Sequence, residues 1–308
     1  MIDPKVEDST HQPGEEVAPG FEVIAHLRRG KRLDVYDVWS VERACRCIAK
    51  TIIPERLGEE KAHLMLAAES DLLLQLTHPN IVRAYELVHS DAGAPVLILE
   101  TLVGRTVSHL IDEFPAGIDI DDVVWLGLHL CSAVAYLHGH GCLHLDIKPD
   151  NVISEAGRAK LIDLSISGPE GPSSAGAGTY DYLAPEQARG ERLSAATDVW
   201  GIGITLYEAL TGTVPFEPDD DGADDDDDDD DDDGDSDDTD ASGDFDPDSY
   251  PQATERAPRV ATRRADVPGP LAEIIDACLE REPANRPSVA ELAEKLALVS
   301  PDVSLRKA

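Results

Sequence analysis

Residues 144–151, His-Leu-Asp-Ile-Lys-Pro-Asp-Asn, combine the side chains that phosphoryl transfer from ATP requires. Asp146 can accept the proton of an attacking hydroxyl group, and Lys148 can neutralise charge on the moving phosphoryl group. Asn151 can hold a Mg²⁺ ion. One octapeptide can arise by coincidence, so this interpretation requires the other phosphate-handling residues to follow in order along the chain.

An ammonium group for the phosphates is expected upstream. Lys50 closes an apolar, β-prone stretch, Cys47-Ile-Ala-Lys, which predicts a strand that carries the lysine. Glu69 lies in residues 63–76, which have the apolar spacing and strong helix formers of an amphipathic helix. We expect this Glu to reach back to Lys50 and hold its ammonium group on the phosphates. The helix should end before Pro79, since the residue preceding a proline avoids the helical region.

A metal-binding group and three further motifs follow downstream. Asp163 lies in the strand-like stretch Ala-Lys-Leu-Ile-Asp-Leu-Ser, which resembles a segment that holds Mg²⁺ against the β- and γ-phosphates in phosphoryl-transfer enzymes. An Ala-Pro-Glu motif ends at Glu186, and Asp198-Val-Trp-Gly opens the next long apolar helix. Arg286 follows near the end of the chain in Asn-Arg-Pro-Ser.

Together these motifs resemble those of eukaryotic-type (Hanks-type) serine/threonine protein kinases, over about residues 20–300. The resemblance implies an α+β, two-lobed fold with a small β-rich N-lobe, a larger α-helical C-lobe and ATP in the crevice between them. It also implies that Arg286 pairs with Glu186. The excess of Arg over Lys, with abundant Ala and Asp, is typical of bacteria with high-GC genomes.

The resemblance further implies Mg²⁺-dependent transfer from ATP to Ser and Thr hydroxyl groups of protein substrates. Leu99 becomes the gatekeeper, and the Thr179 hydroxyl group bridges Asp146 and Lys148. For the apolar adenine-binding residues, ordinary core packing is the open alternative. The implied catalytic residues are Asp146, Lys148 and Lys50; the cofactor-binding residues are Gly30, Val35, Ala49, Lys50, Glu69, Glu100, Leu102, Asn151, Ile153 and Asp163; the metal ligands are Asn151 and Asp163.

The glycine-rich loop of the family is degenerate in this chain. Where the family has Gly-x-Gly-x-x-Gly-x-Val, only the middle glycine, Gly30, is present, and Arg28 and Leu33 occupy the outer positions. Side chains there hinder approach of the backbone to the phosphates, so we expect weakened nucleotide binding. Three basic neighbours are expected to compensate in part by attracting ATP. These neighbours are Arg29, Lys31 and Arg32.

Leu145 replaces the arginine that pairs with a phosphorylated activation loop in many kinases of this family. We therefore expect activity that does not require loop phosphorylation, even when every Ser and Thr between 165 and 179 is Ala. Leu164-Ser165 stands where the family has Phe-Gly, and the leucine can still fill an apolar slot. The Gly-, Ser- and Ala-rich segment 165–179 should be mobile, which makes its serines candidates for autophosphorylation.

The net charge of −36 is unevenly distributed. Residues 219–248 contain 20 Asp and no Lys or Arg, a composition that predicts disorder. This segment is either a solvated spacer, a docking arm for a basic partner, or a clamp over the basic loop residues. The expected organisation is a disordered acidic N-terminal tail at 1–19, a kinase domain at 20–300 (N-lobe 20–100, hinge 100–104, C-lobe 105–300) interrupted by 219–248, and a C-terminal tail at 301–308.

Several observations favour a cytoplasmic protein. The five cysteines form no CxxC pair, and Cys45 and Cys47 are interpreted as small buried side chains on one face of a strand. We expect no signal peptide, and the apolar stretch 123–137 is shorter than a membrane span and predicts a buried helix. The acidic charge balance opposes binding to nucleic acid.

Two other functions stay open from the sequence. A pseudokinase-like binding module, whose acidic arm recruits partners, is favoured by Arg28 and Leu33 and opposed by the intact Asp146 and Asp163. A small-molecule kinase of the aminoglycoside or choline type shares the His-x-Asp…Asn loop, but Lys148 and the Ala-Pro-Glu motif disfavour it.

Four histidines between residues 129 and 144 raise the question of a metal site. No carboxylate or cysteine completes a ligand set at suitable spacing. His144 matches a family position whose ring packs under the Asp163 segment.

Overall fold

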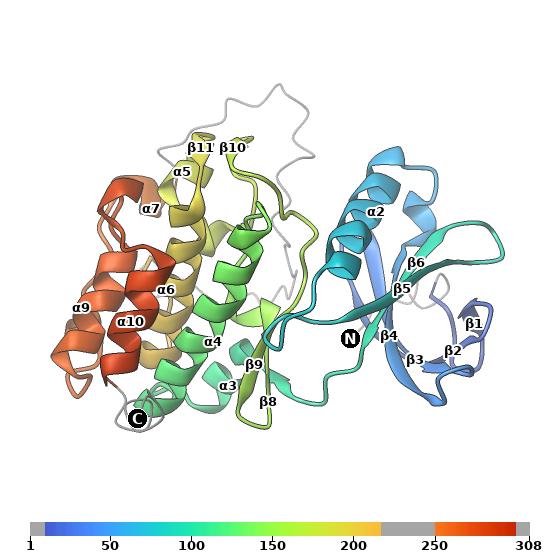
Figure 1. The fold of residues 1–308 in the computed structure, drawn as a ribbon, viewed down its shortest axis with the longest axis horizontal. Helices are drawn as coiled ribbons and strands as arrows, with labels where there is room; N and C mark the ends of the chain where they lie inside the picture. Colours follow the sequence, from blue (N-terminus) through green and yellow to red (C-terminus); the bar gives the residue numbers. More distant parts are fainter. Residues whose placement is uncertain (1–9, 217–249, 300–308) are drawn as a thin grey trace, which may run out of the picture. The chain divides into compact units, whose positions relative to one another are not determined.

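The computed structural model describes residues 10–216 and 250–299, and the chain divides between Val103 and Gly104 into two compact units. The division lies inside the segment 100–104 that was predicted as a hinge. Strands dominate the first unit and helices the second, which confirms the predicted α+β class (Figure 1).

A six-stranded sheet forms the body of the first unit. Its strand order is β1-β2-β3-β4-β6-β5, and every pairing is antiparallel. The strands are β1 (Glu16–Ala18), β2 (Phe21–Arg29), β3 (Leu33–Ser40), β4 (Cys45–Ile52), β5 (Ala84–His89) and β6 (Pro95–Glu100), and a 3₁₀ turn (Pro54–Arg56) follows β4.

Helix α2 (Glu60–Gln75) packs against β4, β5 and β6 (Figure 1). Leu66 and Leu73 are buried on the same side of the helix as Glu69. The helix ends as the proline rule predicts, because Leu76 has already left the helical region with a ψ of 138°.

One apolar cluster of the first unit lies on a single face of the sheet. Side chains alternate along a strand, so Cys47 and Ala49 of β4 point to this face together with Tyr36 of β3 and Phe21 of β2. Cys47 is fully buried and Cys45 is partly buried against the core. The prediction of a buried side chain is therefore confirmed for Cys47.

Residues 10–19 do not form the disordered tail that their composition predicts. Glu16–Ala18 is strand β1, paired with β2, and Val17 and Ala18 are at most 2% exposed within the core. Val17 and Ala18 are only two apolar residues within an acidic, Pro-rich stretch, so its composition did not indicate a strand. Their burial stabilises β1. Residues 1–9 lie outside the described part of the chain.

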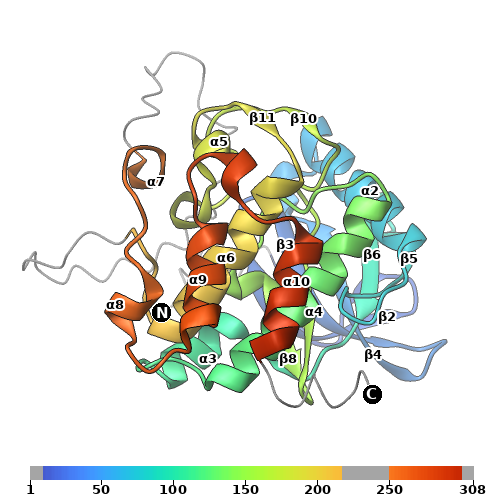
Figure 2. The same cartoon turned by 60° about the vertical axis from the view of Figure 1, so that its left-hand side comes forward.

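Four helices lie side by side in the second unit (Figure 1 and Figure 2): α4 (Ile120–Gly139), α6 (Ala195–Thr211), α9 (Gly269–Cys278) and α10 (Val289–Val299). Helix α4 begins at Asp119, whose side chain accepts the N–H of Asp121 at 2.9 Å. Helix α6 begins at Ser194, whose side chain caps it, and ends at Gly212, whose φ of 75° suits a glycine.

Shorter elements connect these helices. A three-stranded antiparallel sheet has the order β7-β8-β9, and a two-stranded one pairs β10 with β11. The elements are β7 (Arg105–Thr106), α3 (Val107–Glu113), a 3₁₀ turn (Pro149–Asn151), β8 (Val152–Glu155), β9 (Arg158–Leu161), β10 (Gly171–Pro172), a 3₁₀ turn (Tyr180–Tyr182), α5 (Pro185–Ala188), β11 (Arg192–Leu193), α7 (Pro251–Thr254), α8 (Val260–Arg263) and a 3₁₀ turn (Pro283–Asn285).

Among the described helices, α4 alone is long and apolar enough to cross a membrane, by length and composition. Nine of its residues are buried inside the second unit, Leu130, Val134 and Leu137 among them. Packing against α6, α10 and β9 therefore accounts for its apolar composition, as predicted for residues 123–137.

A buried ion pair joins distant parts of the second unit. The Arg286 guanidinium donates to both carboxylate oxygens of Glu186, at 2.7 and 2.8 Å, and both side chains are at most 2% exposed. Arg286 also donates to the carbonyl oxygens of Ala196 and Glu280, and it lies 5.0 Å from the ring centre of Trp200. The predicted pairing of Arg286 with Glu186 is confirmed.

The Asp-rich segment predicted to be disordered, 219–248, lies outside the described residues, as does the tail predicted at 301–308. Tyr250, where the described chain resumes, packs against Tyr180 with ring centres 4.8 Å apart. The chain therefore re-enters the fold beside the 3₁₀ turn that begins at Tyr180.

Replacing Arg286 by Ala should lower the free energy of unfolding by about 3–5 kcal/mol, because it leaves the buried Glu186 carboxylate without its cation. Arg105→Ala is the matched control, since Arg105 pairs with Glu113 at a half-exposed site, where a pair contributes about 1 kcal/mol or less. Urea unfolding of the full chain measures both losses. Equal losses in the two variants would contradict a special role for the buried pair.

Candidate active site

Within the first unit, Glu69 holds the ammonium group of Lys50. The Lys50 Nζ lies 2.8 and 2.9 Å from the two carboxylate oxygens, and neither side chain is more than 8% exposed. Strand β4 supplies the lysine and helix α2 the glutamate, so the ion pair fixes the helix against the sheet. The contact predicted from the sequence is confirmed, and it leaves the ammonium group in a fixed position.

Ala49, predicted to contact the adenine ring, lies on the face of the sheet opposite Lys50. Ala49 neighbours Lys50 on β4, so alternation points it into the core, where it is fully buried. Ile48 shares the Lys50 face, and so does Val35, which is directly opposite Lys50 in the β3–β4 register. Leu99, the predicted gatekeeper, is opposite Ile48. The predicted contact of Ala49 with adenine is therefore wrong, whereas Ile48 lies on the same face as Lys50.

The hinge predicted at 100–104 begins at the last residue of β6. The Glu100 N–H donates to the Arg83 carbonyl oxygen and the Glu100 carboxylate accepts the Arg83 N–H, both at 2.9 Å. Among the described residues, the buried Thr101 Oγ1 has no hydrogen-bond partner. The contacts of Glu100 and Leu102 with adenine stay predictions.

The β2–β3 hairpin turns where the glycine-rich loop was expected. The Gly30 N–H donates to the Leu33 carbonyl oxygen at 2.9 Å and closes the turn. Next to it, Arg29 and Asp34 face each other in the strand register, and the guanidinium donates twice to the carboxylate, at 2.9 and 2.7 Å. A two-pronged ion pair therefore ties the two strands together at the turn.

Two of the three basic residues expected to attract ATP are paired with neighbouring carboxylates. Arg32 is 5% exposed and donates to Glu59 at 3.1 Å, while Arg29 is bound to Asp34. Lys31 is the exposed one of the three. Arg29 and Arg32 are therefore less able to attract ATP than the sequence suggested.

Asp34 is fully buried and gathers polar groups from two strands, β2 and β3. Besides Arg29, the His26 Nε2 lies 2.9 Å from its Oδ1, and the Tyr36 hydroxyl group donates to its Oδ2 at 3.4 Å. Burial raises the pKa of Tyr36 to about 12, so the hydroxyl group keeps its proton. The His11 N–H donates to the Tyr36 oxygen at 3.2 Å, which links the N-terminal segment to the hairpin.

In the second unit, the Thr179 hydroxyl group joins Asp146 and Lys148 of the catalytic loop, residues 144–151. Thr179 Oγ1 donates to Asp146 Oδ1 at 2.9 Å and accepts from Lys148 Nζ at 2.8 Å, which confirms the predicted bridge. Asn151 Nδ2 donates to the carbonyl oxygen and to Oδ2 of Asp146, at 2.9 and 2.8 Å. Each oxygen of the carboxylate is thus oriented by one bond. Ile153 lies half-buried in β8, and its contact with adenine stays a prediction.

Asn151 and Asp163 are the oxygen donors available for a divalent cation. The Ile162 N–H donates to the Asn151 carbonyl oxygen at 2.8 Å, which ties the Asp163 segment to the catalytic loop. Asp163 has a φ of 61°, and its Oδ1 accepts the Ser165 N–H at 3.2 Å. The Asn151 amide nitrogen donates to Asp146, and its oxygen is the atom that would coordinate a cation. One carboxylate with one amide oxygen fits Mg²⁺, which takes its other ligands from water and phosphate.

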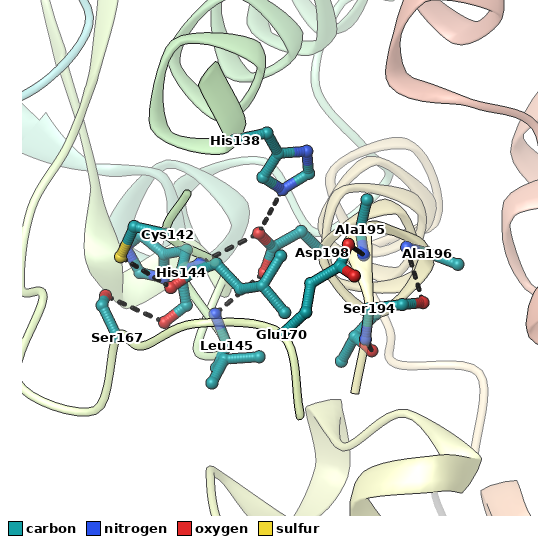
Figure 3. Close-up of polar contacts among 12 residues, drawn as sticks. His138, Cys142, His144, Leu145, Ser167, Glu170, Ser194, Ala195, Ala196 and Asp198 are labelled. Atoms are coloured by element: carbon teal, nitrogen blue, oxygen red, sulfur yellow. Dashed lines mark hydrogen bonds and ion pairs between the residues drawn. The ribbon is translucent and has the colours of Figure 1, made fainter. Parts of the chain in front are cut away.

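Asp198, in the first turn of α6, anchors the catalytic loop (Figure 3). Its buried carboxylate accepts the N–H groups of His144 and Leu145, at 2.9 and 2.8 Å, and lies 2.7 Å from His138 Nε2. The sequence indicated only that Asp198 opens a helix. An acidic residue at the start of an otherwise apolar helix was the signal that could have revealed this role.

The catalytic loop needs close packing against α6. Leu145 has a φ of 71°, a conformation that costs a non-glycine residue about 1–2 kcal/mol, so external contacts must hold it. Gly201 of α6 admits Ile147, because a Cβ at Gly201 would lie 2.9 Å from the Ile147 Cβ. Leu164 is 2% exposed, and its predicted packing against the helix that carries Glu69 stays a prediction.

The four histidines between 129 and 144 do not converge on one site. Burial lowers the pKa of His129, which keeps its ring neutral. In the described part of the chain, no group of three or more His, Cys, Asp or Glu side chains is arranged to hold a metal. Their partners are the Ala159 N–H for His129, Asp198 for His138, the Tyr136 carbonyl oxygen for His140 and the Asp146 N–H for His144.

The two units carry complementary chemical groups. The second unit provides an oriented carboxylate, a lysine beside it and two oxygen donors for a cation. The first unit provides a fixed ammonium group, a hairpin and the start of a hinge. These are the groups that phosphoryl transfer from a nucleotide employs.

The profile of the protein kinase domain family matches residues 21–296, and the chain belongs to this family. The serine/threonine-protein kinase pkn3 of Myxococcus xanthus is 26% identical over 301 residues, which cover 92% of this chain and 50% of that protein. The probable serine/threonine-protein kinase PknB of Bifidobacterium longum is 32% identical over 228 residues, covering 68% and 33%. The chain thus spans a third to a half of these relatives' length.

Solved structures show the same fold. The kinase domain of Mycobacterium tuberculosis PknI superposes with a TM-score of 0.67 at 20% identity, covering 94% of this chain and 100% of that one. A point mutant of the same domain gives a TM-score of 0.68 at 19% identity. The predicted protein-kinase fold is confirmed.

Replacing Asp34 by Asn should lower the free energy of unfolding by about 1.5–3 kcal/mol, because the Arg29 guanidinium loses its charged partner. It should also weaken nucleotide binding, since the ion pair shapes the hairpin turn. Glu86→Gln is the matched control, because it breaks the ion pair with Arg43 elsewhere in the same sheet. Urea unfolding and calorimetric titration with a non-hydrolysable ATP analogue measure the two effects. Unchanged affinity in Asp34→Asn would refute the link between this pair and the nucleotide.

Proposed function

We propose that the chain transfers the γ-phosphoryl group of ATP to Ser and Thr hydroxyl groups of proteins, with Mg²⁺ as cofactor. The observation that carries this proposal is the hydrogen-bonded set of Asp146, Thr179 and Lys148. The names of the bacterial relatives, which are serine/threonine-protein kinases, support the same activity.

Each residue has a defined task in this mechanism. Asp146 accepts a hydrogen bond from the acceptor hydroxyl group and takes its proton as the phosphoryl group is transferred. Lys148 beside it and Lys50, held by Glu69, place positive charge near the transferring phosphoryl group. Mg²⁺, when bound by Asn151 and Asp163, neutralises charge on the phosphates.

The proposal includes activity without phosphorylation of residues 165–179, which are called the activation segment from here on. Leu145 offers no cation to a phosphate group, and main-chain contacts hold the segment instead. Leu143 and Gly168 exchange two backbone hydrogen bonds, at 2.7 and 3.1 Å, and β10 pairs with β11. The Ser167 hydroxyl group donates to the His144 carbonyl oxygen at 3.1 Å.

The alternative of a catalytically inactive binding module is not favoured. The Lys50–Glu69 pair and the oriented Asp146 carboxylate are arranged for transfer, and an inactive module needs neither. We place the activity in the cytoplasm, because the five cysteines are free thiols. We further propose that the Asp-rich segment 219–248 docks a basic partner, on the strength of its charge alone.

Asp146→Asn should reduce phosphoryl transfer by about 10²–10⁴-fold, because an amide cannot accept the hydroxyl proton. The measurement is incorporation from labelled ATP with Mg²⁺, into the protein itself and into a generic basic substrate. Asp266→Asn, at an exposed surface pair, is the control and should match wild type. Equal incorporation in Asp146→Asn and wild type would refute the proposal, and label on Tyr would refute the Ser/Thr assignment.

The double variant Ser173→Ala/Ser174→Ala should keep its activity within about twofold, because the Leu145 side chain cannot form an ion pair with a phosphate group. The protein is first dephosphorylated and checked by mass spectrometry. The broader exchange of every Ser and Thr from 165 to 179 does not test this point, because it removes the Thr179 hydroxyl group that orients Asp146. Thr179→Val serves as the positive control and should lose about 10- to 100-fold. A tenfold loss in the double Ala variant would contradict phosphate-independent activity.

A further inference from the structure

Gln187 is a buried glutamine for which no sequence motif indicated a role. It is the third residue of the short helix α5 and is 3% exposed. It directly follows Glu186, whose ion pair with Arg286 holds the backbone of this helix in place. Its side chain is therefore presented from a rigid element.

Both polar atoms of the Gln187 amide are engaged. Oε1 accepts the N–H of Ala184 at 3.0 Å, and Nε2 donates to the carbonyl oxygens of Leu145 and Ala177, at 2.8 and 3.1 Å. A flipped amide would set oxygen against two carbonyl oxygens and nitrogen against an N–H. The network therefore allows one orientation of the amide.

These contacts lie on either side of the central pair of the catalytic site. Leu145 directly precedes Asp146, and Ala177 lies two residues before Thr179, which donates to Asp146 at 2.9 Å. One side chain thus ties the catalytic loop to the activation segment next to the place where Asp146 meets Thr179.

Packing around the amide is tight. Gly178, beside Ala177, has a φ of 130°, and a Cβ there would lie 2.7 Å from Leu183 Cδ2 and 3.4 Å from Gln187 Nε2. The cavity beside Gln187 holds only about 10 Å³, at the lower limit for one water. A displaced amide could not be replaced by several waters here.

We propose that Gln187 is a positioning residue that locks the activation segment onto the catalytic loop through a neutral amide. In kinases that carry an arginine at the position of Leu145, pairing with a phosphorylated loop makes this connection. Here the Leu145 side chain cannot pair with a phosphate, but its carbonyl oxygen is held by Gln187. The inference rests on the proposed kinase activity and explains how that activity persists without a phosphate group.

Gln187→Glu tests the proposal with an isosteric change. A carboxylate has no donor for the two carbonyl oxygens, so at alkaline pH kcat should fall about 10- to 100-fold while KM for ATP changes less than about twofold. Protonation of this buried carboxyl group restores one donor, so the ratio of variant to wild-type kcat should rise as the pH falls. Wild type carries the same neighbouring groups, Asp146, Tyr182 and Asp198, which line this cavity, so it serves as the reference at each pH.

Two further variants sharpen the result. Gln187→Leu should lose kcat to a similar degree without recovery in acid. Gln252→Glu is the matched control for a buried glutamine. Gln252 donates to the carbonyl oxygen of Tyr180, directly after the activation segment, and not to the catalytic loop. Melting temperatures are measured for all variants, so that loss of fold and loss of positioning are separated.

Each outcome decides between the proposals. An inactive wild type refutes the proposed function. An active wild type with Gln187→Glu equal to it at every pH refutes the positioning role, as do equal losses of kcat and melting temperature in Gln187→Glu and Gln252→Glu. Acid recovery confined to Gln187→Glu supports the positioning role.

Discussion

The catalytic loop depends on one buried carboxylate. Asp198 lies in the apolar interior of the second unit, where an ionised group is costly unless hydrogen bonds satisfy it. Two of its donors are the N–H groups of consecutive residues, His144 and Leu145. Because the N–H groups of His144 and Leu145 both donate to Asp198, they are not free to form the backbone hydrogen bonds of a helix or a strand. The loop is therefore irregular at these two residues. The left-handed conformation of Leu145 follows from this constraint, and it directs Asp146 toward Thr179.

Buried ion pairs connect segments that are far apart in the sequence throughout the molecule. Lys50 and Glu69 join a strand to a helix, and Glu186 and Arg286 join two ends of the helical unit. Such pairs add little net stability compared with apolar packing of the same volume, but a lone partner left in the interior is heavily penalised. These ion pairs therefore disfavour folds in which one partner is buried alone. This keeps the functional side chains in defined positions.

The sequence predicted those contacts whose residues belong to motifs with a fixed order and spacing. The catalytic loop, the Lys50–Glu69 contact and the Glu186–Arg286 pair could be predicted because each of their residues lies in a short motif that is recognisable from the sequence alone. The assignment of Ala49 failed by one position, and a one-residue shift on a strand moves a side chain to the other face. The carboxylate partners of Arg29 and Arg32, and the contacts of Gln187, are set by tertiary packing between segments, which no local pattern records.

Strand β1 has a practical consequence for any fragment of this protein. The family match begins at residue 21, after β1 has ended, so a recombinant piece cut at that boundary lacks Val17 and Ala18. The outer edge of β2 would then expose unpaired N–H and C=O groups beside an uncovered apolar core. Such an edge pairs readily with another chain, so the shortened piece would be prone to aggregation, whereas one that begins near Thr10 keeps its own edge covered.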